Sequence, residues 1–464
     1  MCASVVRFPR AGRWERLVSA VTVVRRGEGP LALLLSLQVA VLMAAYYVLK
    51  AARDALVLTE GGAEVRSYAA AGQALLLFAV APAYGWIASR LNPVRFIRLL
   101  SAFAVSNLVA FAVAGNAGWT IGVPFYLWVG VFNVTAIAQF WAFASDVYSE
   151  DQGQRLFAVL GIGSALGGFA GAQAASFLFT RLGPYSLMGV AAVLLALSMG
   201  IVSVAQRLAR CGRESGAKRI AEPIKGASNG FRMVFASRYL TLIAAMVVLL
   251  NLVNTTGEFM LSKMAVEEAH KVAATPVARQ QFIGSFYAGY YAWITLAGAL
   301  AQVLLASRVL RWVGAGGALL ILPAIALGGY AAFAVAPALA IIKMTKVLEN
   351  STDYSIAATA RHALLLPASR ETRYKAKSVI DTFFYRIGDL AQGGIVAIGH
   401  YFAFSLSGYA LVNVGFTIVW LAVATALYAQ HRELMRPTPI VAPQHGSHPA
   451  PAGGLAPRTE RLVG

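Results

Sequence analysis

The stretch Ala338–Leu366 reads ALAIIKMTKVLENSTDYSIAATARHALLL and is long enough to cross a membrane. An ionisable group at the centre of a bilayer costs at least about 2.5–3.5 kcal/mol, so it persists only where it faces a bundle interior, a partner or a watery pathway. We therefore expect this segment to be a helix that lines a route for a charged solute. Its interior carries four ionisable side chains, Lys343, Lys346, Glu349 and Asp353.

The whole chain has the composition of an integral membrane protein. Of its 464 residues, 58% are hydrophobic and only 13% are charged. Apolar stretches of about 20 residues follow one another along the chain, and they predict an all-α, polytopic membrane protein with about twelve transmembrane helices. The predicted spans are Leu31–Lys50, Ser67–Ser89, Arg95–Ala114, Val123–Val147, Leu156–Phe179, Tyr185–Ala205, Tyr239–Lys263, Phe282–Ala306, Gly317–Val335, Ala338–Leu366, Val379–Phe402 and Gly408–Tyr428.

The loops between these spans alternate in charge. Every second loop is rich in Lys and Arg, whereas Gly115–Gly122 and Ala336–Pro337 carry no charge. Because basic loops are retained in the cytoplasm during insertion, both termini are predicted to be cytoplasmic and the number of spans to be even. Residues 1–30 form a basic cytoplasmic segment in this scheme, and the Pro-rich residues 430–464 form a disordered cytoplasmic tail.

The spans divide into two sets of six on either side of a basic linker, residues 207–238. The two sets echo each other at an offset of about 220 residues, as when Ala88-Ser89-Arg90 returns as Ala306-Ser307-Arg308. We therefore predict two pseudo-symmetric six-helix halves, residues 31–206 and 239–429, with a site between them near the middle of the membrane.

The charged spans near the C-terminal end offer candidate site residues. Lys346, Glu349 and Asp353 share one helix face, and the next span opens at Asp381 and carries a cation and a carboxylate three residues apart, Arg386 and Asp389. Two interpretations remain open: salt bridges that hold helices together or latch a gate, and cations that meet an anionic substrate. Lys343, Lys346 and Arg386 are the cations placed deepest in the predicted spans.

Other spans carry further candidates. Snorkelling to the interface explains Lys50, but Arg53 beside Asp54 favours side chains that face a cavity. Glu258 in the seventh span has to find a partner on another helix, a proton or a solute. Asp146 ends a polar and aromatic run in the fourth span.

Several chemistries are excluded by what the sequence lacks. It has no Gly-Lys-Ser/Thr phosphate-binding loop and no His or Cys cluster at ligand spacing, which argues against ATP-hydrolysing pumps and most metalloenzymes. Glycines recur every four residues at Gly163, Gly167 and Gly171, a pattern typical of close helix packing. The net charge of +19 consists mostly of loop arginines, with anionic lipid head groups as neighbours and no nucleic acid as partner. We expect no enzyme activity, no cofactor and no metal, and the oligomeric state stays open.

Particular motifs resemble known families. Gly85–Arg90 resembles the second-loop motif of the major facilitator superfamily, although Ser89 stands where that motif has aspartate. Four other segments resemble the nucleotide transporter (ATP/ADP translocase) family of plastids and intracellular bacteria and its free-living bacterial relatives: LKAARDAL at Leu49–Leu56, FWAFASD at Phe140–Asp146, NLVN at Asn251–Asn254 and KVLENSTDYS at Lys346–Ser355.

This resemblance implies a secondary transporter of a bacterial inner membrane that works by alternating access. It would exchange ATP for ADP plus phosphate, or carry another nucleotide or phosphorylated anion. The family's charged positions correspond here to Lys50, Arg53, Asp146, Glu258 and the ladder from Lys346 to Asp353.

Two alternatives stay open: a proton-coupled symporter or exporter in which Glu258 or Asp353 cycles a proton, and a non-transporting membrane scaffold. The predicted substrate-binding residues are Lys50, Arg53, Lys343, Lys346 and Arg386, and the predicted gating or coupling residues are Asp54, Asp146, Glu258, Glu349, Asp353, Asp381 and Asp389.

Overall fold

The computed structural model describes residues 28–90, 93–212, 227–364 and 376–434. These residues form helices joined by short turns, and they contain no β-strand, which confirms the predicted all-α class. The predictions for the N-terminal segment 1–30 and the tail 430–464 fall mainly outside the described residues, as does the middle of the linker.

The first half is built from four helices, two of which cross the bundle twice. The longest ones are each broken at a glycine of positive φ, Gly62 (φ 76°) and Gly183 (φ 72°), a backbone conformation that glycine adopts at little cost. Each therefore supplies two antiparallel spans. The helices are α2 (Gly29–Arg90), α3 (Pro93–Asn116), α4 (Gly122–Val147) and α5 (Glu150–Gly212).

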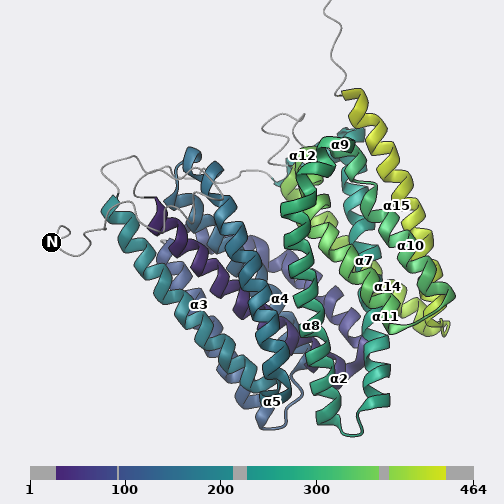
Figure 1. Ribbon diagram of the computed structural model, residues 1–464, viewed down its shortest axis with the longest axis horizontal. Helices are drawn as coiled ribbons and strands as arrows, with labels where there is room; N and C mark the ends of the chain where they lie inside the picture. The colour runs from purple at the N-terminus through teal and green to yellow at the C-terminus, as the bar shows by residue number, and fades with distance from the viewer. Residues whose placement is uncertain (1–27, 91–92, 213–226, 365–375, 435–464) are drawn as a thin grey trace, which may run out of the picture.

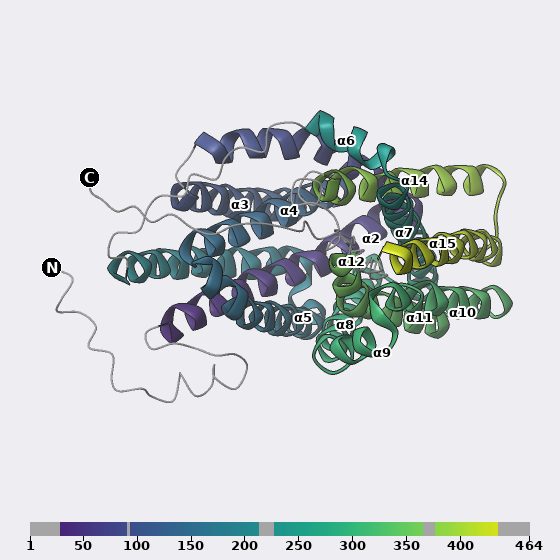
Figure 2. The same ribbon diagram turned by 90° about the horizontal axis from the view of Figure 1, so that it is seen from above.

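The second half is more irregular. Three of its spans contain five-residue π-helical turns (η), each continuous with an α-helix. Figures 1 and 2 show the helices of this half packed beside those of the first half. Its elements are α6 (Ala227–Ala236), α7 (Arg238–Val272), α8 (Pro276–Ala301), η1 (Gln302–Ala306), α9 (Ser307–Ala318), α10 (Ile321–Val335), α11 (Leu339–Thr352), η2 (Asp353–Ala357), α12 (Ala358–Leu364), η3 (Ile380–Phe384), α14 (Tyr385–Tyr401) and α15 (Leu406–Leu434).

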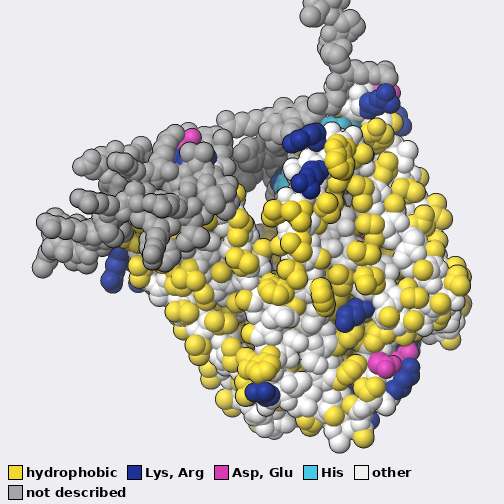
Figure 3. All heavy atoms as spheres, in the orientation of Figure 1, with side chains coloured by type: hydrophobic (Ala, Val, Ile, Leu, Met, Phe, Trp, Pro, Cys, Tyr) yellow, Lys and Arg dark blue, Asp and Glu magenta, His cyan; other side chains and the backbone are white. Residues whose placement is uncertain are grey.

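The helices match the predicted spans. Among the described residues, seven helices are long and apolar enough to cross a membrane, and three of these, α2, α5 and the continuous α8–α9 segment, are much longer than one crossing needs. Three predicted spans are not among these seven helices. The helix α10 is too short, and the segments α11–α12 and η3–α14 are interrupted by π-turns and carry charged residues. Hydrophobic side chains cover the sides of the bundle in Figure 3, as a lipid-facing surface requires.

The two halves lie side by side, and in Figure 1 their helices diverge toward the top. We call this end the linker side, because the helix ends that border residues 91–92, 213–226 and 365–375 lie there. The opposite end, the far side, holds the turns at Gly62 and Gly183 and the short loop between α7 and α8.

Several helices extend beyond their predicted ends, and two of these extensions carry charged residues near the site. The first arm of α2 continues from Lys50 to the break at Gly62, and α7 continues past Lys263 to Val272. The sequence prediction ended both where charged residues begin. In α2, Arg53 and Asp54 pair with each other inside the protein, so the helix continues past Lys50 without an aqueous loop. In α7, Lys263 pairs with Glu64, and the last turns carry exposed charged residues.

The glycine stripe of α5 lies against the first arm of α2. A Cβ placed on Gly167 would lie 2.1 Å from the carbonyl oxygen of Ala40, and one on Gly171 would lie 2.4 Å from that of Ala44. Only the lack of a side chain allows the two backbones to approach this closely, as the four-residue repeat predicted.

We predict that Gly167→Ala destabilises the protein by about 1–3 kcal/mol, because its methyl group would displace the α2 backbone. The melting temperature of the purified protein in detergent measures this effect. Gly161→Ala is the matched control, since a Cβ there on the same helix meets nothing within 4 Å. Equal melting temperatures for the two variants would contradict the proposed backbone contact.

Candidate functional site

A cavity of about 260 Å³ lies between the two halves. It is lined from the first half by α2 and α4 and from the second half by α7, α8, α11, η2 and α14. Its charged lining residues are Lys50, Arg53, Arg66, Glu258, Arg386 and Asp389.

Asp54 organises the wall of the first half. This fully buried carboxylate accepts hydrogen bonds from Arg53 Nη2 at 3.0 Å, from Arg66 Nε at 3.3 Å and from the Tyr291 hydroxyl. The Arg53 guanidinium also lies over the Tyr126 ring, 4.3 Å from its centroid. Both arginines are thereby fixed in orientation beside the cavity.

Arg66 also connects the two halves. Its Nη2 lies 3.4 Å from Glu258 Oε2, so one guanidinium bridges a carboxylate of α2 and a carboxylate of α7. Glu258 accepts further hydrogen bonds from the Tyr290 hydroxyl at 2.6 Å and from the Asn350 amide at 3.1 Å. A buried carboxylate with this many donors is stabilised in its ionised form.

Lys346 lies behind the cavity wall. Its side chain is 0% exposed, and its ammonium group contacts Glu349 at 2.8 Å, Glu258 at 3.7 Å and the Asn254 carbonyl oxygen at 2.9 Å. Glu349 accepts a further hydrogen bond from the Tyr330 hydroxyl. Two hydrogen bonds and the longer ion pair with Glu258 hold the ammonium group in place. Lys346 is not itself a lining residue of the cavity, so in this state it positions Glu258.

Lys50 differs from the other cations. Its Nζ lies 4.0 Å from the centroid of the Tyr291 ring, and within the described part of the chain no carboxylate forms an ion pair with it. A cation held over an aromatic face at a cavity surface remains available to an anion.

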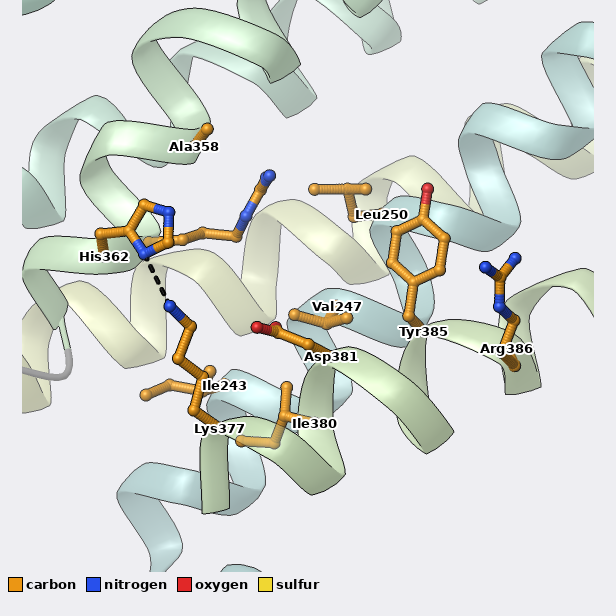
Figure 4. Close-up of a pocket in the computed structure, with 11 residues that line it drawn as sticks. Ile243, Val247, Leu250, Ala358, His362, Lys377, Ile380, Asp381, Tyr385 and Arg386 are labelled. Carbon is orange, nitrogen blue, oxygen red and sulfur yellow. Dashed lines mark hydrogen bonds between the residues drawn. The ribbon is translucent and has the colours of Figure 1, made fainter. Parts of the chain in front are cut away.

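Arg386 links this cavity to a second one on the linker side. It pairs with Asp389 at 3.1 Å, and Asn251 also donates to Asp389 at 2.8 Å. Arg386 and Tyr385 line the second cavity as well, which has a volume of about 330 Å³. Figure 4 shows Asp381, Lys377 and His362 around it, with Lys377 Nζ 3.0 Å from His362 Nδ1. The predicted residues Arg386, Asp381 and Asp389 therefore lie along one polar route.

Besides Asp381, which lines only the second cavity, three predicted residues lie away from the main cavity. Lys343 is half-buried over the Phe286 ring, 5.0 Å from its centroid, and Asp146 is exposed at the linker-side end of α4. Asp353 pairs with Arg361 at 2.6 Å near the second cavity. None of the three lines the main cavity, and their predicted roles stay predictions.

Arg66 was missed by the sequence analysis. It falls between predicted spans, in a segment that was read as a loop, and it pairs with residues 12 and 192 positions away. The signal that could have identified it is the sequence after Asp54, where turn-forming residues are confined to Gly61 and Gly62.

The halves are closed against each other on the far side. Lys263 of α7 pairs with Glu64 of α2 at 2.9 Å, and Gln281 of α8 donates to the Thr180 carbonyl of α5 at 3.2 Å. Gly284 of α8 also lies so close to Phe179 that an added Cβ would be 2.2 Å from its ring. Polar and tightly packed contacts therefore separate the cavity from this side.

We predict that Lys346→Met destabilises the protein by about 3–5 kcal/mol, because Glu349 would become a buried charge with no cation. The double variant Lys346→Met/Glu349→Met should recover most of the loss in melting temperature. Lys343→Met, one turn earlier on α11 and half-buried, is the control and should shift it little. A double variant as unstable as the single one would refute the pairing.

Comparison with known proteins agrees with this architecture. No family model matches the chain. It is 23% identical over 404 residues to ADP,ATP carrier protein 1 of Chlamydia pneumoniae, an alignment that covers 78% of this chain and 77% of that protein.

Solved structures of transporters are similar in fold. They include the POT family transporter PepTSo (TM-score 0.62, 11% identity, 86% of this chain and 98% of that one), the nucleoside transporter NupG (0.59, 11%, 88% and 100%) and an inward-facing bacterial homolog of the lysosomal transporter Spinster (0.54, 17%, 89% and 98%). The sequence match bears out the predicted resemblance to the nucleotide transporter family. The structural matches show that this all-helical chain shares the fold of these solved structures.

Proposed function

We propose that this protein is a secondary transporter that exchanges nucleotides, or closely related phosphorylated anions, by alternating access across a bacterial inner membrane. The observation that carries the proposal is the cavity between the halves, in which both halves present cations to one enclosed space. The printed name of its Chlamydia relative, an ADP,ATP carrier, supports the substrate class.

Lys50, Arg53, Arg66 and Arg386 are the proposed ligands of the substrate anion. Lys50 is free of carboxylates in the described structure, and the guanidinium groups have the planar donor geometry that matches phosphate oxygens. A phosphate bound to Arg66 would compete with Glu258 for that guanidinium. Substrate binding would thereby weaken one of the ion pairs that join the two halves. The halves could then move relative to each other more easily when the cavity holds substrate.

The described state would load from the cytoplasm. The far side is closed by the Lys263–Glu64 pair, whereas the second polar cavity adjoins the site on the linker side. Because the basic loops assign the linker side to the cytoplasm, the cavity would communicate with that compartment. Exchange follows if the loaded carrier reorients faster than the empty one, whose cations are costly to move without an anion.

We predict that proteoliposomes loaded with unlabelled ADP take up labelled ATP, and that Lys50→Ala lowers this uptake at least tenfold. A hydrogen bond to a charged group is worth about 1.5–3 kcal/mol, and about 1.4 kcal/mol corresponds to a factor of ten. Lys343→Ala is the matched control and should retain uptake, since Lys343 lies outside the cavity lining.

Two results would count against this function. Absence of uptake by correctly inserted wild-type protein would rule out nucleotide exchange. Uptake that needs a pH gradient and no internal nucleotide would favour a proton-coupled carrier, the alternative in which Glu258 or Asp353 cycles a proton.

We also predict that the Glu64–Lys263 pair keeps the far side closed. Cys2 and Cys211 would first be replaced by Ser, and Thr255 in the cavity wall by Cys. An impermeant thiol reagent should then reach Cys at this position from the cytoplasmic side only. Glu64→Gln should add labelling from the opposite side, and the charge swap Glu64→Lys/Lys263→Glu should abolish it again. Unchanged labelling in Glu64→Gln would show that other contacts close this side.

A further inference from the structure

Two amide side chains in the cavity wall have unmet hydrogen-bonding capacity. Six amides line the cavity, and four of them have partners: Asn251 donates to Asp389, Asn254 to Asn350, Asn350 to Glu258, and Gln392 to Ser67. The side-chain oxygens of the other two, Gln73 and Asn133, are buried and have no donor among the described residues. An unsatisfied buried acceptor costs about 1–3 kcal/mol, so a donor supplied by a ligand would recover that energy.

These two amides belong to one local site. Gln73 lies directly against Gly130 of α4, where an added Cβ would be 2.0 Å from its Oε1. Asn133 is three residues further along α4 and lines the same cavity, so it shares the helix face with Gly130. The missing side chain at position 130 makes the space into which Gln73 extends.

The amides lie about two helical turns from the arginines of the first half, Arg53 and Arg66. On α2, Arg66 and Gln73 both line the cavity and are seven residues apart, and on α4 Tyr126 and Asn133 have the same separation. Two helical turns correspond to about 10 Å. Arg53 lies over the Tyr126 ring, so Tyr126 marks the position of a cation on α4, as Arg66 does on α2. Both α4 and the second arm of α2 run from the far side to the linker side. On each helix the amide therefore lies nearer the linker side than the cation does. This separation suits the distance between the phosphate and the base of a nucleotide.

We propose that Gln73 and Asn133 determine base specificity by recognising the amino edge of adenine. The inference rests on the proposed function and adds residues that bind the uncharged end of the substrate. An Asn or Gln amide offers a donor and an acceptor side by side, which matches ring nitrogen N7 and the exocyclic amino group of adenine. On this edge hypoxanthine presents two acceptors, which one amide cannot satisfy together. Ala70 and Val134, which line the cavity beside these amides, supply an apolar surface for the ring.

Hypoxanthine is the discriminating comparison, because it replaces the amino donor of adenine with a carbonyl acceptor. The experiment measures dissociation constants for ADP, IDP and pyrophosphate from the ligand-dependent rise in melting temperature of the purified full-length protein. The variants are Gln73→Leu and Asn133→Leu. Gln38→Leu is the matched control, because the Gln38 oxygen is also buried without a donor but lines a different cavity.

Wild-type protein and Gln38→Leu should bind ADP about tenfold more tightly than IDP. Each cavity variant should bring that ratio close to one while its affinity for pyrophosphate, which has no base, stays within about twofold. A preserved pyrophosphate response also shows that the variants are folded.

Two other results overturn the inference in distinguishable ways. In the first, pyrophosphate binds, but either the wild-type protein binds ADP and IDP equally or the cavity variants keep the preference for ADP. The amides then do not select the base, and the proposed function stands. If neither nucleotides nor pyrophosphate bind the wild-type protein, the proposed function fails and the base site fails with it.

Discussion

The bridge made by Arg66 between Asp54 and Glu258 is the interaction on which the centre of this protein depends. Three ionised groups lie almost out of contact with water, where an isolated charge would be prohibitively costly. They are tolerated because each has a partner of opposite sign, and the two carboxylates accept further hydrogen bonds from tyrosine or asparagine. The bridge also joins the two halves at the level of the cavity, so any change of partner at Arg66 affects both halves.

The aromatic residues of α8 complete this arrangement. Tyr290 and Tyr291 donate to the two carboxylates of the bridge, and the face of Tyr291 holds Lys50. One helix thus stabilises the anions with its hydroxyl groups and a cation with its ring. Lys50 stays at the cavity surface without a carboxylate, which is the arrangement that an incoming anion can use.

The sequence predicted the fold class and most helices, because hydropathy, loop charge and glycine spacing are local signals. It also identified most of the charged residues around the cavity, since an ionisable residue within an apolar span is conspicuous. Arg66 could not be found in this way, because its position depends on α2 continuing past Lys50. Lys346 was identified as charged and buried, but its place behind Glu258 follows from helix packing that no local pattern encodes.

The π-helical turns suggest how the second half could change shape without losing its helices. Among the described residues they occur in the second half alone, at η1, η2 and η3. The turn η2 begins at Asp353, which pairs with Arg361, and η3 contains Asp381. A π-turn accommodates one additional residue, and moving it along a helix rotates the intervening side chains by about 100°. The rim of the second cavity could therefore exchange one set of side chains for another by a register shift. The first half has no such turn among its described residues, and its α2 and α5 are in close backbone contact.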